Sequence, residues 1–216
     1  MTSKAELIVL NHTKFSENSI VLHTLSAQYG RRGFLVKVGP KTRMALFLPL
    51  NILEAEVTEN PKSELWFARN FASVAPLNGI RGNIRKNTMT LFMSEVLYRV
   101  VKDQTNEDGL ADWLKRQILT LDALESDFAN FHLWFLLELC TALGFDPDTT
   151  GIAPFAGDRL TMLESLLTRP FTEAMLVPLS GADRNAIAES ILKYIEYHTE
   201  SAVNVRSLAV LREIYG

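Results

Sequence analysis

The sequence predicts an α+β protein in which an N-terminal five-stranded β-barrel is followed by an all-α helical domain. Up to about residue 75, short apolar runs alternate with turn residues at the period of β-strands. From about residue 83, apolar residues recur at the period of an α-helix. The charges divide near the same place, because residues 1–87 carry a net charge of +6 and residues 88–216 a net charge of −9, which together give −3. We therefore expect two domains, 1–78 and 79–216.

The first domain is expected to contain strands at 5–13, 18–25, 33–38, 48–58 and 65–74. The fourth shows the clearest alternation, since Leu53, Ala55 and Val57 face one way and the polar residues between them face the other. Five short strands, rich in basic and aromatic residues, favour a small barrel of the OB type, although other five-stranded barrels would give a similar pattern.

The fifth expected strand places Leu65, Phe67 and Phe71 on one face. A turn at 29–33 precedes the third strand, and an exposed loop at 39–43 follows it. These two connections carry most of the basic residues discussed below.

Five helices are expected in the second domain, one of them after Ser180. Apolar stripes over 89–100 and 110–121 predict two amphipathic helices, and 205–215 predicts a short last one. The stretch 128–143 is apolar nearly all round, but it contains His132 and Glu138 and has only 16 residues. It predicts a buried central helix rather than a membrane span.

Glycine and proline mark the end of the central helix. Gly144 is a natural C-terminal cap, and the stretch to Gly157 holds three Gly and two Pro without a helical period. We expect a loop, or the remnant of a zinc motif, around 145–158. Further on, Ser180 and Asp183 form a capping-box pattern that predicts a helix containing the apolar residues Ile187, Ile191, Leu192 and Ile195.

The residues indicate no catalytic site and no cofactor. There is neither a glycine-rich phosphate loop nor a His-Glu-x-x-His motif, and the four histidines are far apart in the sequence. Cys140 is the only cysteine, which excludes an intrachain disulfide and a cysteine-built zinc site and favours a cytoplasmic protein. His132 and Cys140 are expected in the core. A metal-dependent nuclease or hydrolase is the least favoured alternative.

Five cations within 13 residues form the strongest binding signal. On the strands and turns of one small sheet, such residues could line a groove for a phosphate backbone, or they could form a solvated basic rim. If five phosphates are neutralised, log K for single strands should fall with log salt at a slope of roughly −3 to −4. The residues are Arg31, Arg32, Lys37, Lys41 and Arg43. Tyr29, beside the first two, is the candidate for stacking on a base.

Several segments resemble the RecO family of recombination mediators and DNA repair proteins, in the same order along nearly the whole chain. They are Phe15-Ser16-Glu17-Asn18-Ser19-Ile20-Val21-Leu22, Tyr29-Gly30-Arg31, 33–37, 92–99, 130–133, 143–147 and 207–214. The resemblance implies an OB domain followed by a helical domain. It also implies binding of single- and double-stranded DNA, annealing of complementary strands, and no covalent chemistry or nucleotide cofactor.

The resemblance also implies partners. These are RecR and the acidic C-terminal tail of single-strand binding protein, with which such proteins help to load a recombinase at single-stranded gaps near the nucleoid, without any membrane. The region of Asn130 and His132 is poor in cations, so a clamp for the tail would have to come from elsewhere on the helical half. The candidates are Arg99, Lys102, Lys115 and Arg116.

The chain departs from the family in one clear place. Many members carry a four-cysteine zinc motif after the central helix, whereas the matching stretch 148–157 contains no cysteine. We therefore expect no zinc. The alternative function is a protein-interaction scaffold with little intrinsic affinity for DNA, which the acidic total charge favours.

Overall fold

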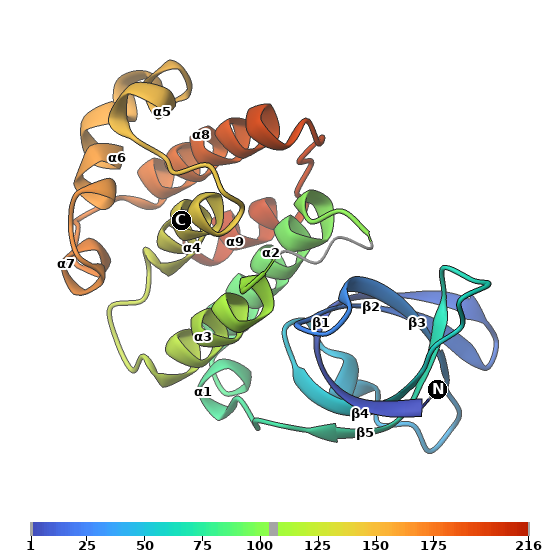
Figure 1. The fold of residues 1–216 in the computed structure, drawn as a ribbon. Coiled ribbons are helices and arrows are strands. Elements are labelled where there is room, and N and C mark those ends of the chain that lie inside the picture. The colour runs from blue at the N-terminus through green and yellow to red at the C-terminus, as the bar shows by residue number, and fades with distance from the viewer. Residues whose placement is uncertain (1, 104–107, 216) are drawn as a thin grey trace. The chain divides into compact units, whose positions relative to one another are not determined.

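The computed structural model describes residues 2–103 and 108–215 (Figure 1). The chain forms two compact units, one made of Met1–Asn78 with Val101–Ile118 and the other of Gly79–Val100 with Leu119–Gly216. In the described ranges, none of the helices has both the length and the apolar character needed to cross a membrane.

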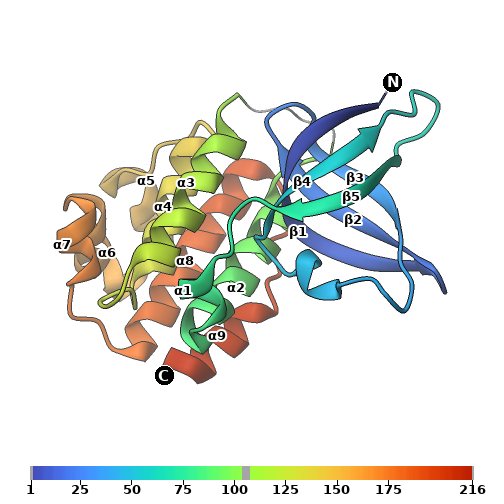
Figure 2. The same cartoon turned by 90° about the horizontal axis from the view of Figure 1, so that it is seen from below.

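The first unit contains a closed barrel of five strands in the order β1-β2-β3-β5-β4, which confirms the predicted fold class. All neighbouring pairs are antiparallel except β3 and β5, which run parallel. Figure 1 looks along the barrel, and Figure 2 shows the same strands from the side. The elements are β1 (Thr2–Ser16), β2 (Ser19–Ser26), β3 (Gly30–Lys37), the 3₁₀ turn η1 (Met44–Phe47), β4 (Ile52–Thr58) and β5 (Trp66–Ser73).

Alternating side chains fill the barrel. Leu53, Ala55 and Val57 of β4 are buried, as the sequence predicted, and Phe34 of β3 and Phe47 of η1 join them in the core. Because successive residues of a strand point to opposite faces, the side chains between these positions are left for the outer surface.

The face predicted for the fifth strand is wrong, because β5 contains a bulge. Asn70 and Phe71 together lie opposite the single residue Ala55 of β4, and Asn70 has a φ of 56°. The extra residue shifts the alternation by one. Phe71 therefore packs inward against Phe47, with 5.0 Å between ring centroids, whereas Phe67 is exposed.

The second unit is helical and is built around α4 (Phe131–Ala142), which packs against α2 (Ile84–Val100), α7 (Phe171–Met175) and α8 (Gly181–Thr199) (Figure 1). Eight of the twelve residues of α4 are buried, as a central helix requires. The other elements are α1 (Asn78–Arg81), α3 (Leu110–Ala123), whose first part belongs to the barrel unit, α5 (Thr149–Ala156), η2 (Gly157–Arg159), α6 (Leu160–Leu167) and α9 (Ser207–Tyr215).

Hydrogen bonds at helix N-caps confirm the predicted start of α8 and explain a helix where a loop was predicted. The Ser180 hydroxyl accepts a hydrogen bond from the Asp183 N–H at 3.1 Å and begins α8, as the capping pattern indicated. The predicted loop around 145–158 instead contains α5. Asp148 caps this helix by accepting the Gly151 N–H at 2.7 Å, and burial of Ile152 favours the helical turn despite the glycines and prolines.

Candidate nucleic-acid interface

An open groove of about 840 Å³ lies on the barrel, between β3, β5 and the loop that leads into η1. We call it the basic groove, because Lys37, Lys41, Arg43 and Arg69 line it. Its remaining lining is mixed, with Phe67 and Phe71 supplying aromatic surface and Thr58 and Asn70 supplying polar groups. Such a combination of cations and aromatic side chains suits a chain that carries phosphates.

Three of the five cations predicted from the sequence meet in this groove. Lys37 ends β3, while Lys41 and Arg43 come from the turn that follows. That turn is closed by two hydrogen bonds, from the Thr42 N–H to the Gly39 carbonyl at 2.9 Å and from the Gly39 N–H to the Thr42 hydroxyl at 2.8 Å. No carboxylate of the described residues forms an ion pair with these three cations, so their charge is available to a ligand.

Arg31 lies apart from the basic groove and is occupied elsewhere. Its side chain is only 8% exposed; its Nε lies 3.0 Å from an Asp103 carboxylate oxygen, and a guanidinium N–H donates to the Val101 carbonyl. These partners are 70 and 72 residues away in sequence, on the segment that completes the barrel unit. These contacts occupy the guanidinium of Arg31 within the barrel unit, and its contact with DNA stays a prediction.

Arg32 points to the opposite face of β3 from Arg31. Its guanidinium carbon lies 4.0 Å from the centroid of the Trp66 ring, a cation–π contact, and it does not line the basic groove. Tyr29 meets the same tryptophan edge-on, with 5.2 Å between centroids, and its hydroxyl shares a hydrogen bond of 2.7 Å with Ser3. Contacts within the barrel therefore hold Tyr29, the predicted stacking residue.

Arg69 is a groove cation whose direction could not be read from the sequence. Its Nε lies 3.0 Å from Glu56 on β4. Hydrogen bonds from Asn70 and from Arg69 hold the pKa of Glu56 below its ordinary value, so this carboxylate stays ionised and competes with any anion for Arg69.

The four residues proposed for partner binding do not form one cluster within either unit. Arg99 is exposed on α2 in the helical unit, whereas Lys102, Lys115 and Arg116 belong to the barrel unit. Lys115 donates to both carboxylate oxygens of Glu6, at 2.7 and 2.8 Å, which occupies its ammonium group.

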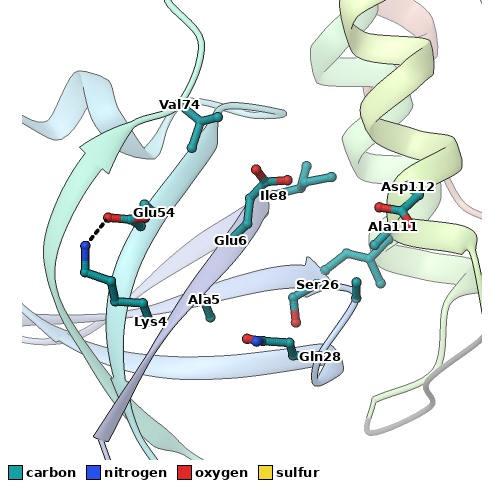
Figure 3. A pocket seen from close by; sticks show the side chains of 12 residues that line it. Lys4, Ala5, Glu6, Ile8, Ser26, Gln28, Glu54, Val74, Ala111 and Asp112 are labelled. Atoms are coloured by element: carbon teal, nitrogen blue, oxygen red, sulfur yellow. Dashed lines mark hydrogen bonds and ion pairs between the residues drawn. The ribbon is translucent and has the colours of Figure 1, made fainter.

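A second cavity, of about 470 Å³, has the opposite electrostatic character (Figure 3). The carboxylates of Glu6, Glu54 and Asp112 line it, and Lys4 pairs with Glu54 at 2.8 Å. Figure 3 shows Glu6 and Glu54 on neighbouring strands and Asp112 on α3. A surface with three carboxylates repels phosphates, so the basic groove is the better site for a polyanion.

His132 and Cys140 lie in the core of the helical unit. Burial, together with the charge of Arg184, lowers the pKa of His132 to about 3, and burial raises the pKa of Cys140 to about 12. Both side chains are almost completely buried, as predicted. Among the described residues, no three His, Cys, Asp or Glu side chains are grouped so that they could hold a metal ion.

Comparison with known proteins agrees with this architecture. Residues 1–76 match the family model "Recombination protein O N terminal", and residues 81–153 match "Recombination protein O C terminal". The DNA repair protein RecO of Bacteroides fragilis is 31% identical over an alignment that covers 100% of this chain and 91% of the relative. The corresponding proteins of Flavobacterium psychrophilum and Phocaeicola vulgatus are 26% and 28% identical, with 100% of both chains covered in each case. The chain therefore belongs to the RecO family of DNA repair and recombination proteins.

Proposed function

We propose that this protein is a recombination mediator that binds DNA in the basic groove and anneals complementary strands. The observation that carries the proposal is the meeting of Lys37, Lys41 and Arg43 in one open groove, without a carboxylate of the described residues paired to any of them. Family membership supports the biological setting, because the relatives are DNA repair proteins.

The mechanism follows from the chemistry of the groove. Two strands of DNA repel each other, and cations that neutralise phosphates lower this repulsion and release counterions. Lys41 lies in the turn closed by two hydrogen bonds, and Arg43 follows this turn directly, so binding phosphates there should cost little backbone conformational entropy. Contacts to phosphates leave the base edges free to pair, and binding should be independent of sequence. No catalytic step is part of this proposal.

The proposed partners are RecR and the acidic tail of single-strand binding protein, with which the protein would help to load a recombinase at single-stranded gaps, in the cytoplasm near the nucleoid. Resemblance to the family supports this part. Arg99, Lys102, Lys115 and Arg116 remain candidates for the partner surface; Arg99, Lys102 and Arg116 are exposed, and Lys115 pairs with Glu6. We keep 1–78 as the proposed DNA-binding domain and 79–216 as the proposed helical domain, with the segment 101–118 completing the barrel unit.

The decisive test is a double charge reversal, Lys41→Glu with Arg43→Glu, followed by fluorescence anisotropy with a labelled oligonucleotide. We expect the affinity to fall at least about tenfold, because two phosphate contacts become repulsive. The matched control is Lys193→Glu with Arg212→Glu, which makes the same change of charge on exposed residues of α8 and α9.

The same variants should then be compared in annealing of complementary strands coated with single-strand binding protein, with and without RecR. Equal losses in both double variants would show that only total charge matters. Intact binding by the groove variant would contradict the proposed site. A wild-type protein without measurable affinity for DNA would favour the alternative function of a protein-interaction scaffold.

A further inference from the structure

Phe67 of β5 is an exposed aromatic side chain in the lining of the basic groove. It is 47% exposed, although Phe34 and Phe47 of the same barrel are buried and Phe71 packs against the core. Its exposure follows from the bulge at Asn70, which sends Phe71 inward and leaves Phe67 on the outer face. About half of this apolar ring is open to solvent, where it can contact a ligand.

The neighbours of Phe67 place its ring beside cations. Its register partners are Leu35 on β3 and Thr58 on β4, both of which line the groove. Lys37 and Arg69 lie two residues beyond Leu35 and Phe67 on the same face, roughly 7 Å further along the strand direction at about 3.3 Å per residue. This spacing is comparable to the reach of one nucleotide from its phosphate to its base.

We propose that Phe67 stacks on an unpaired base and makes the basic groove selective for single-stranded over double-stranded DNA. This proposal rests on the proposed function, because the cations must first hold the backbone. Every base has a π-face, so stacking tolerates any sequence. In a duplex both faces of each internal base are covered by neighbouring pairs, and only phosphates are offered to the groove.

The test is Phe67→Ala, with affinities measured for a single-stranded oligonucleotide and for its duplex of the same length. Loss of one stacked base should weaken single-strand binding about 5- to 100-fold. Duplex affinity should change less than about twofold, and the salt dependence should stay the same, because no phosphate contact is lost. Phe67→Trp should restore single-strand affinity, whereas Phe67→Leu, which keeps apolar volume without a π-face, should not.

Phe15→Ala is the matched control, because Phe15 is 60% exposed on β1 and does not line the groove. It should leave both affinities unchanged. Stacking also predicts an ultraviolet crosslink between oligo(dT) and Phe67, located by mass spectrometry. Thermal unfolding of each variant should match the wild type, since the ring is half exposed.

Three results would overturn the proposal: unchanged single-strand affinity in Phe67→Ala, equal losses for single strands and duplex, or full rescue by Phe67→Leu. The charge-reversal variant at Lys41 and Arg43 separates this failure from that of the proposed function, because it should lose both single-strand and duplex binding. If only the charge reversal has an effect, the groove binds DNA without stacking. If only Phe67→Ala has an effect, stacking is supported, but cations other than Lys41 and Arg43 hold the backbone and the proposed cationic site is wrong.

Discussion

Arg31 and Lys37 lie on the same face of one strand and have different roles. They are six positions apart on β3, about 20 Å along the strand. At the start of the strand, Asp103 and the Val101 carbonyl receive the guanidinium of Arg31, whereas the ammonium of Lys37 is exposed at the end. A charge with internal partners stabilises the fold, and a charge without them can bind a ligand.

We expect Arg31→Ala to lower the free energy of unfolding by about 1–3 kcal/mol, because it leaves the buried Val101 carbonyl without its donor. Lys37→Ala should change it by less than about 0.5 kcal/mol. Chemical denaturation followed by circular dichroism measures both. Equal stability of the two variants would mean that the contacts of Arg31 with Val101 and Asp103 contribute nothing to stability, and would favour contact of Arg31 with DNA.

At the scale of the element, β5 determines the surface of the groove. Its bulge exposes Phe67 and Arg69 together, and its pairing with β4 brings Glu56 to Arg69. The low pKa of Glu56, caused by hydrogen bonds from Asn70 and Arg69, keeps its negative charge at neutral pH. The carboxylate therefore weakens the attraction of this strand for phosphates.

Glu56→Gln should raise the affinity for an oligonucleotide by about two- to fivefold, the effect of releasing one exposed ion pair. Glu54→Gln is the control, because Glu54 lies on the same strand and pairs with a cation, Lys4, but lines the second cavity. Anisotropy titrations at low salt measure both. Similar gains in the two variants would indicate a general effect of charge, and no gain would mean that Arg69 does not contact DNA.

For the whole molecule, net charge is a poor guide to binding. The chain carries −3, and even residues 1–78, with nine Lys or Arg and six Asp or Glu, carry only +3. Arg31, Lys4 and Arg69 each pair with a carboxylate. Because exposed charges beyond a Debye length of about 8–10 Å are screened, the cations grouped in the groove should decide the affinity.

The salt dependence tests this view. Three phosphates neutralised by Lys37, Lys41 and Arg43 give a slope of log K against log salt of about −2 on single strands, and Arg69 would bring it to about −3. This is shallower than the roughly −3 to −4 expected when all five predicted cations were counted. A titration series from low to moderate salt measures the slope. A slope near zero would contradict electrostatic binding, and one near −4 would mean that more cations than these contact DNA.

The sequence by itself determined the two-part architecture, because strand and helix periods are local properties of the chain. It predicted the five strands, the central helix, the cap at Ser180 and the buried His132 and Cys140. It missed α5, whose cap and buried residues outweigh its glycines and prolines.

Only the tertiary structure decided which side chains share the groove. Arg31 is withdrawn from it by a residue 72 positions later, and Phe67 is exposed by a bulge that a period-2 pattern does not reveal. Lys37, Lys41, Arg43 and Arg69 meet because β5 pairs with β3 on one side and β4 on the other. The physical reason is that a binding surface depends on contacts between residues distant in sequence, whereas secondary structure follows largely from neighbouring residues.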